Sequence, residues 1–146
     1  MTQTSTPLNF ATLRVSGDDA ALDNLVGTLN LQVVSRVKAG DPRRRGGAYP
    51  ASTLNAPIAD AASPGGLPDQ IRAFLAECLK HGPTLFGNGI EAELSVGISV
   101  GKSQYLASVE FSPVEMRDLA YLGIALNVTA YPSSDGANDV VDRASA

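Results

Sequence analysis

An uninterrupted alternation of apolar and polar residues from Glu91 to Val100 constrains this fold more than any other feature of the sequence. Side chains along a β-strand point alternately to the two faces of a sheet. An apolar face and a polar face are typical of an antiparallel sheet that packs on the core on one side and meets solvent on the other. The apolar positions here are Ala92, Leu94, Val96, Ile98 and Val100.

The same period of two predicts further strands. After a hairpin at Gly101–Ser103, the alternation resumes from Gln104 to Phe111, which predicts a second antiparallel strand beside the first.

The residues from Ala56 to Pro68 have the composition of a loop, because Pro and Gly are frequent there. Other segments predicted to be extended are Ala11–Val15, Val33–Lys38, Tyr49–Leu54 and Ile124–Tyr131.

Three segments repeat apolar residues at helical spacing. The first follows a capping-box pattern formed by Ser16 and Asp19, and it should end near Asn30. We interpret Asp18 and Asp19 as helix-start residues and not as metal ligands. The second helix begins at Pro68 and Asp69 and ends before Gly82. The third has Ser112 as its N-cap, with Pro113 and Glu115 in its first turn, and it ends at Gly123.

This order of strands and helices predicts an α+β fold. We expect a two-layer sandwich, in which helices pack on one face of a mixed, mostly antiparallel sheet. The folded domain is expected over residues 10–131, preceded by a flexible arm at residues 1–9 and followed by a disordered acidic tail at residues 132–146.

Composition excludes several classes of protein. The formal net charge is −4, so the chain has no general attraction for nucleic acid, and a nucleic-acid partner is not expected. No apolar run approaches the roughly 20 residues that cross a bilayer, and the first residues do not form a signal peptide. The single cysteine, Cys78, cannot form an intramolecular disulfide. We therefore expect a cytoplasmic protein that does not enter a membrane.

The strongest candidate for a ligand site is the arginine run Arg43, Arg44 and Arg45, between a turn containing Asp41 and two glycines. Guanidinium groups bind phosphate or carboxylate bidentately, so this loop could hold a small anion or an acidic partner. The alternative is a solvated basic loop whose charge is balanced by Asp41.

A second candidate is acidic. Glu91, Glu93 and Glu110 fall on the polar sides of two strands that are predicted to be adjacent. Paired carboxylates support acid–base chemistry if burial separates their pKa values, but the alternation places these groups on an open face. Such a face is either simply solvated or docks a basic protein partner.

No catalytic residue, metal site or cofactor is predicted. His81 is the only histidine, and it falls at the end of a helix, where a cation is favoured by the helix dipole. Cys78 lies in the centre of an apolar helical stripe, where a thiol is inert. These two residues are too few to form a structural zinc site.

The succession of these motifs resembles the bacterial family catalogued as domain of unknown function 4279. The resemblance covers Ala11 to Tyr131, although this chain lacks the tryptophan-centred strand that usually follows the Gly-Asp-Pro turn in the family; Tyr49 and Pro50 stand near that place. It implies the fold and a bacterial intracellular setting, and it brings no established activity. The matching motifs are Ser16-Gly17-Asp18-Asp19, Gly40-Asp41-Pro42-Arg43, ELSVGISV, Ser112-Pro113 and GIALNVTAY.

The leading functional hypothesis is a non-catalytic binding or protein-interaction module, of which an immunity-type protein that masks a toxin is one form. A small-anion-binding protein or an enzyme built on Arg43–Arg45 is the alternative. A third hypothesis is a structural role in which sheet edges pair between subunits.

Overall fold

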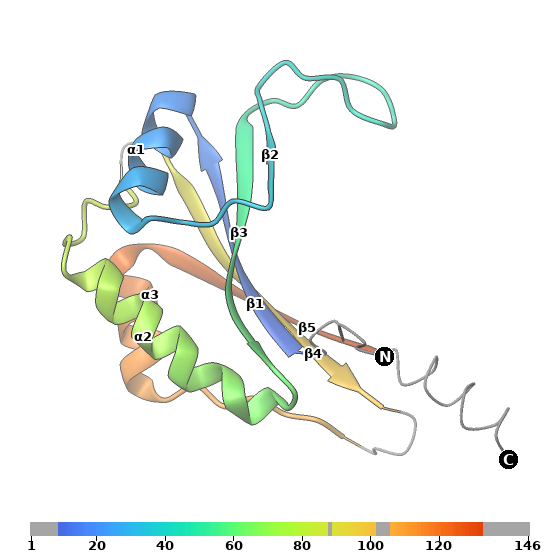
Figure 1. Ribbon diagram of the computed structural model, residues 1–146, viewed down its shortest axis with the longest axis vertical. Coiled ribbons are helices and arrows are strands. Elements are labelled where there is room, and N and C mark those ends of the chain that lie inside the picture. Colours follow the sequence, from blue (N-terminus) through green and yellow to red (C-terminus); the bar gives the residue numbers. More distant parts are fainter. Residues whose placement is uncertain (1–8, 88, 102–105, 133–146) are drawn as a thin grey trace, which may run out of the picture.

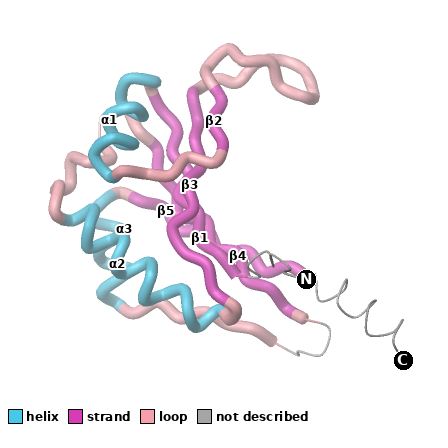
Figure 2. The backbone as a smooth tube through the Cα atoms, viewed as in Figure 1, coloured by secondary structure: helices cyan, strands magenta, loops and turns pink. Residues whose placement is uncertain are grey.

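The computed structural model describes residues 9–87, 89–101 and 106–132 of the chain and has one open sheet with helices on one side of it (Figures 1 and 2). The predicted α+β fold with two layers is confirmed. In chain order the elements are β1 (Asn9–Gly17), α1 (Asp19–Leu29), β2 (Ser35–Val37), β3 (Ser52–Ala61), the 3-10 helix η1 (Pro64–Gly66), α2 (Leu67–Leu79), β4 (Glu91–Val100), α3 (Pro113–Leu122) and β5 (Ile124–Pro132).

The strands follow the order β2-β3-β1-β4-β5 across the sheet. β1 pairs antiparallel with both β3 and β4, and β2 pairs antiparallel with β3. The units β1-α1-β2 and β3-α2-β4 are therefore β-α-β units with another strand inserted between their two strands, the split β-α-β arrangement. The last helix, α3, connects β4 to the adjacent parallel strand β5, which makes the sheet mixed.

The core lies between the sheet and the helices and follows the predicted periodicities. Along β1, Ala11, Leu13 and Val15 are fully buried, and they alternate with more exposed polar residues. The helices bury apolar stripes against these strands; the fully buried helical residues are Leu22, Leu25, Leu67, Ile71, Leu75 and Cys78. The helices thus cover one face of the sheet and leave the other to the polar side chains.

The strand predicted from Gln104 to Phe111 is wrong. Residues 106–112 contain no strand, and residues 102–105, with most of the predicted hairpin, lie outside the described residues. β4 already has β1 on one edge and β5 on the other, so no edge remains for a hairpin partner. Ala107, Val109 and Phe111 nevertheless pack against the core. The alternation therefore correctly indicated that one side of this segment is buried, but it did not show whether the segment pairs with a strand.

The loop predicted from Ala56 to Pro68 is also wrong, because residues 56–61 form the second half of β3. Pro57 lies next to an irregularity in the β1–β3 register, between Ala11 and Thr12, and beyond the three residues of β3 that pair with β2. A proline at a bulge or on a free edge interrupts no ladder hydrogen bond. The predicted extended piece Tyr49–Leu54 overlaps only the first residues of this strand.

The helix ends largely follow their sequence signals. Asn30 and Gly123 adopt left-handed conformations, with φ of 53° and 75°, immediately after α1 and α3. The Ser112–Glu115 capping box is formed. The one predicted from Ser16 is not, because Ser16 lies in β1, where its hydroxyl bonds that of Thr53 at 2.9 Å.

Side-chain contacts of Arg36 and Asn9 hold two strands of the sheet in place. β2 is shorter than the predicted Val33–Lys38, and Arg36 ties it to α1 through Asp19 at 3.0 Å and Asp23 at 2.6 Å. Asn9, which the sequence assigned to the flexible arm, is buried at the start of β1, where its side-chain oxygen accepts a hydrogen bond from the N–H of Ser99 at 3.0 Å.

No helix in the described part of the chain is both long and apolar enough to span a bilayer.

Candidate functional site

The sheet face opposite the helices carries the polar side chains of the strands. These residues occupy the positions between the buried ones, as the alternation predicted for Glu91 and Glu93. Hydroxyl, amide and charged groups gather here from four adjacent strands, and we refer to this surface as the open face. Its polar residues include Thr12, Arg14, Ser16, Thr53, Asn55, Glu91, Glu93, Ser95, Asn127 and Thr129.

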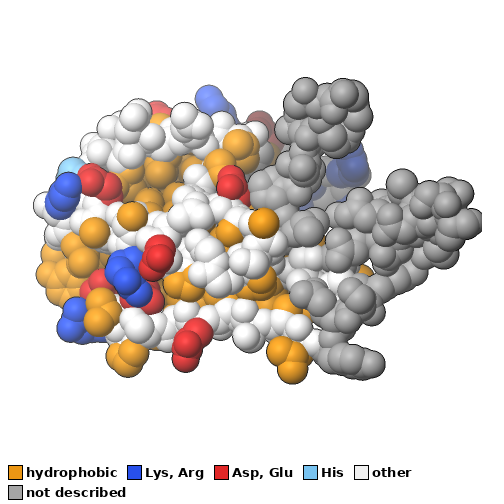
Figure 3. All heavy atoms as spheres, turned by 60° about the horizontal axis from the view of Figure 1, so that its bottom comes forward, with side chains coloured by type: hydrophobic (Ala, Val, Ile, Leu, Met, Phe, Trp, Pro, Cys, Tyr) orange, Lys and Arg blue, Asp and Glu red, His pale blue; other side chains and the backbone are white. Residues whose placement is uncertain are grey.

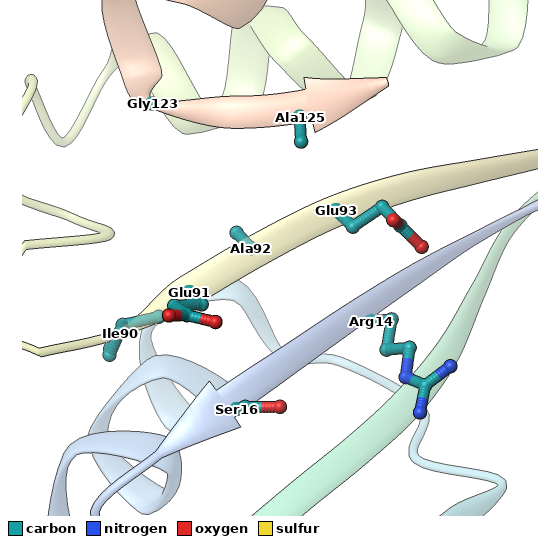
Figure 4. Close-up of a pocket in the computed structure, with 8 residues that line it drawn as sticks. All are labelled: Arg14, Ser16, Ile90, Glu91, Ala92, Glu93, Gly123 and Ala125. Atoms are coloured by element: carbon teal, nitrogen blue, oxygen red, sulfur yellow. The ribbon is translucent and has the colours of Figure 1, made fainter. Parts of the chain in front are cut away.

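A depression of about 460 Å³ lies on this face, at the end where β4 begins (Figure 4). The hollow forms because β5 supplies only small residues there: Gly123 has no side chain, and Ala125, the register partner of Glu93, has a methyl group. It is open to solvent on one side. The remaining lining residues are Arg14, Ser16, Ile90, Glu91, Ala92 and Glu93.

Charges of both signs border the depression. Arg14 and Glu91 are exposed, and Glu93 is half-buried. Arg14 and Glu93 are register partners on adjacent antiparallel strands, yet no ion pair within 4 Å joins them in the described structure. In Figure 4 the guanidinium group of Arg14 reaches towards β3, whereas the carboxylates of Glu91 and Glu93 lie on the β4 side of β1. A ligand can therefore meet a cation and two anions that are not neutralised by one another.

An aromatic pair lies farther along the open face. The ring of Phe10 covers Gly97, where a Cβ atom would come within 2.5 Å of the ring, so any other residue at this position would have to displace the ring. Tyr131 stands beside Phe10, with their ring centroids 6.2 Å apart. Phe10 remains 36% exposed, which gives the open face an apolar end opposite its charged end.

The arginine run lies on a hairpin between β2 and β3, residues 38–51, which projects beyond the sheet in Figure 1. Backbone hydrogen bonds hold its two arms together, including Tyr49 N–H to Asp41 O at 2.9 Å and Arg43 N–H to Gly47 O at 2.9 Å. The guanidinium group of Arg43 lies 5.6 Å from the centre of the Tyr49 ring, and Arg44 and Arg45 are exposed.

Asp41 does not balance the arginines. Its carboxylate accepts the backbone N–H of Lys38 at 2.8 Å and so closes the turn. No ion pair joins Asp41 to Arg43, Arg44 or Arg45, all of which lie in the described residues. The alternative interpretation of this loop, in which Asp41 pairs with the arginines, is therefore not supported by an ion pair among these residues.

Glu110 is separated from the other two predicted acidic residues. It is exposed in the segment 106–112, which is not part of the sheet, whereas Glu91 and Glu93 lie on the open face of β4. The predicted grouping depended on the strand from Gln104 to Phe111 and fails with it. Arg14, which sequence reasoning did not single out, takes the place of Glu110 beside Glu93.

His81 and Cys78 occupy the places that their sequence context predicted. His81 is exposed just after α2, and its backbone N–H bonds Cys78 O at 3.0 Å. Cys78 is fully buried, and this burial raises the pKa of its thiol to about 12. A thiol in this state is a poor nucleophile, and Cys78 packs as one of the residues of the hydrophobic core.

A buried carboxylate on α3 was identified from the sequence only as a helix cap. Glu115 is 1% exposed and also accepts a hydrogen bond from Arg72 Nε of α2 at 3.0 Å. Its hydrogen bonds to Ser112 and Arg72 lower its pKa to about 2. The bonds from Ser112 close the first turn of α3, and the bond from Arg72 joins α2 to α3, so these contacts stabilise the helical layer. The spacing of Ser112 and Glu115 gave the cap, but no local signal indicated Arg72.

The described residues contain no group of three or more His, Cys, Asp or Glu side chains placed to hold a metal ion. Comparison of the chain with protein-family models, with curated proteins and with solved structures finds no match in any of the three.

Proposed function

We propose that this chain is a binding module for another protein, and that the charged end of the open face is its contact surface. The observation that carries this proposal is the open depression bordered by Arg14, Glu91 and Glu93, among which no ion pair forms in the described structure. Sites for small ligands usually enclose most of the ligand. A depression open to solvent on a sheet face suits a macromolecule better.

The chemistry of the surface indicates the partner. Glu91 and Glu93 would receive basic side chains, while Arg14 would receive a carboxylate, so the partner carries both charges with basic groups in excess. The surrounding hydroxyl and amide groups offer hydrogen bonds at the rim. A basic toxin held by an immunity-type protein would fit this description. The resemblance to domain of unknown function 4279 is a separate prediction, and it does not conflict with a binding function.

Charge-reversing variants test the proposal. A tagged wild-type chain is used to isolate a partner from the source cells, and the affinity of the purified partner is then measured by calorimetry. Glu93→Lys should weaken binding at least about tenfold, because it replaces an attraction with a repulsion. Glu110→Lys, the same change at an exposed residue outside the sheet, should leave the affinity unchanged.

A double variant separates local charge from net charge. Arg14→Glu combined with Glu93→Arg keeps the net charge and reverses the local arrangement, so it should also weaken binding. The proposal fails if no partner is recovered under several growth conditions, or if Glu93→Lys and Glu110→Lys have equal effects.

A second candidate function, binding of a small anion, rests on the arginine hairpin. Three cations stand on a projecting, hydrogen-bonded hairpin without a described acidic neighbour within 4 Å. Phosphate or a polycarboxylate should raise the melting temperature of the wild-type chain and not that of an Arg43→Ser, Arg44→Ser, Arg45→Ser variant. Equal responses of the two chains to every anion tested would remove this candidate.

A further inference from the structure

Basic side chains without an ion-pair partner gather at one end of the sheet. The structure describes nine basic residues, and four of them, in β2 and the helical layer, have a carboxylate within 4 Å. On the face presented in Figure 3, basic and acidic side chains accordingly lie next to one another. The five without such a carboxylate belong to the open face or to the arginine hairpin at residues 38–51; they are Arg14, Lys38, Arg43, Arg44 and Arg45.

The arginine hairpin has the opposite charge to the rest of the chain. It contains four basic residues and one acidic residue, Asp41, which give it a net charge of +3. The remaining residues include seven basic and fourteen acidic ones, a net charge of −7. Residues 38–48 are all exposed, and a hydrogen bond from Ala39 N–H to Ser52 Oγ at 3.0 Å fastens the hairpin to the sheet. A braced projection thus concentrates positive charge on an acidic protein.

The hairpin and the charged depression lie at the same end of the sheet. Gly17, the last residue of β1, pairs with Ser52, the first residue of β3 after the hairpin. Ser16 lines the depression and bonds the hydroxyl group of Thr53 at 2.9 Å, and on its other side it pairs with Glu91. In Figure 1 the hairpin projects on the side of the sheet opposite the helices, which is the side of the open face. One molecule on that side can therefore reach both.

We propose that a single protein partner contacts both sites, with an acidic segment on the arginine hairpin and basic groups over Glu91 and Glu93. This inference rests on the proposed function and adds a second half to its contact surface. Arg14 reaches towards β3 and so extends the basic half from the hairpin towards the acidic half (Figure 4). The complementary partner surface is acidic where it faces β2 and β3 and basic where it faces β4.

The exposure of these charges favours one protein over separate small ions. Arg44 and Arg45 stand exposed within a turn closed by Gly46 N–H to Arg43 O at 3.0 Å. A single exposed ion pair contributes little, and sites for small ligands usually enclose the ligand. A partner that has made one contact, however, makes the second within the same complex, so the two contacts reinforce each other.

Nucleic acid fits the combined surface less well than a protein does. A polyanion drawn to the hairpin would be repelled by Glu91 and Glu93 beside it. It would also be repelled by the remaining charge of −7 on the chain. A protein can carry both signs of charge, as this surface requires.

Synthetic peptides of defined charge test whether the two halves act together. One peptide is a block of about six glutamates, another is a block of about six lysines, and a third joins the two blocks. Proline-rich linkers of several lengths, with the blocks in both orders, keep the joined blocks apart. Fluorescence anisotropy at low ionic strength, where charges are least screened, measures binding to the full chain. The joined peptide should bind at least about tenfold more tightly than either block alone.

Two double variants that lose the same charge locate the acidic block. Arg44→Ser with Arg45→Ser removes two cations from the hairpin and should reduce the affinity of the joined peptide to that of the lysine block. Lys80→Ser with Arg117→Ser removes two exposed cations from the helical layer and should change it less than about twofold. Glu93→Lys should reduce it to the affinity of the glutamate block. Circular dichroism verifies that each variant is folded.

The outcomes separate this inference from the proposed function. If Glu93→Lys weakens binding of the lysine block but the joined peptide gains nothing at any linker length, the proposed function stands and the inference fails. If Glu93→Lys leaves the lysine block unaffected, both fail. Equal losses in the two double variants would show that only net charge matters and would overturn the inference. So would a single-stranded oligonucleotide that binds as tightly as the joined peptide, because the hairpin would then accept any polyanion.

Discussion

The buried carboxylate of Glu115 should make the stability of this protein depend on pH in a way that one substitution removes. It accepts hydrogen bonds from the backbone N–H of Ser112 at 3.0 Å, the hydroxyl of Ser112 at 2.6 Å and Arg72 Nε at 3.0 Å. The bonds from Ser112 and then from Arg72 favour the charged form, which lowers the pKa from 4.5 to about 2.

The sign and size follow from that difference. The folded state binds fewer protons than the unfolded state between pH 2 and 4.5, so the stabilisation is complete above the unfolded pKa of 4.5 and is lost as the pH falls towards 2. At about 1.4 kcal/mol per pH unit the full effect is about 3 kcal/mol. Solvent screening at the half-exposed Arg72 reduces the expected value to about 2 kcal/mol.

Urea unfolding of the wild-type chain and the Glu115→Gln variant, followed by circular dichroism, measures the effect. Glutamine has nearly the same size but no charge, so the free energy of unfolding should fall by about 2 kcal/mol at pH 7. Near pH 3 the difference should shrink to about half or less. Glu77→Gln, an exposed carboxylate paired with Lys80, serves as the control and should change little. A deficit of equal size at both pH values would refute the electrostatic explanation.

Three further substitutions or reagents probe the described contacts. Gly97→Ala should lower the free energy of unfolding by about 1–3 kcal/mol, because the new Cβ atom collides with the Phe10 ring. Adding Phe10→Ala should restore part of this loss. A Gly97→Ala variant as stable as the wild-type chain would contradict the contact between Gly97 and the Phe10 ring. Cys78 should react with a thiol reagent only as fast as the chain opens, since it is buried and has a pKa raised to about 12; prompt modification of the native protein would contradict this. Arg36→Lys loses the simultaneous contact of the guanidinium group with Asp19 and Asp23, so amide hydrogen exchange in β2 should accelerate while that in β1 stays unchanged. An unchanged exchange rate in β2 would show that these ion pairs do not stabilise the strand.

Elements with local signals could be predicted from the sequence. The third helix is the clearest example, because Ser112 and Pro113 specify its start and Gly123 its end. β4 was predicted over its full length, since its inward residues had to be apolar along the whole strand. β3 was misjudged because Pro57 resembles a loop residue until its place beside a register irregularity is known. Strand pairing joins distant residues, so no local pattern indicates which edge is free.

The candidate site was half predictable for the same reason. Alternation correctly placed Glu91 and Glu93 on the polar face of their strand. It could not show that β1 would pair with β4, and Arg14 faces Glu93 only because of that pairing. Glu110 was grouped with them by assuming that consecutive strands are neighbours, whereas β5 occupies that edge.

The register of β4 finally explains why the open face can carry a function without weakening the fold. A shift of one residue would move Glu91 and Glu93 into the core, so the burial of the neighbouring apolar residues Ala92 and Leu94 holds both carboxylates on the outer surface. Opposite charges facing each other across strands contribute roughly 0.2–1 kcal/mol when they pair. Arg14 and Glu93 face each other and do not form this ion pair, so the fold gains no such stabilisation from having both charges there. Under the proposed binding function, the two side chains lie close together because both contact a charged partner. The Arg14→Glu, Glu93→Arg double variant tests this explanation.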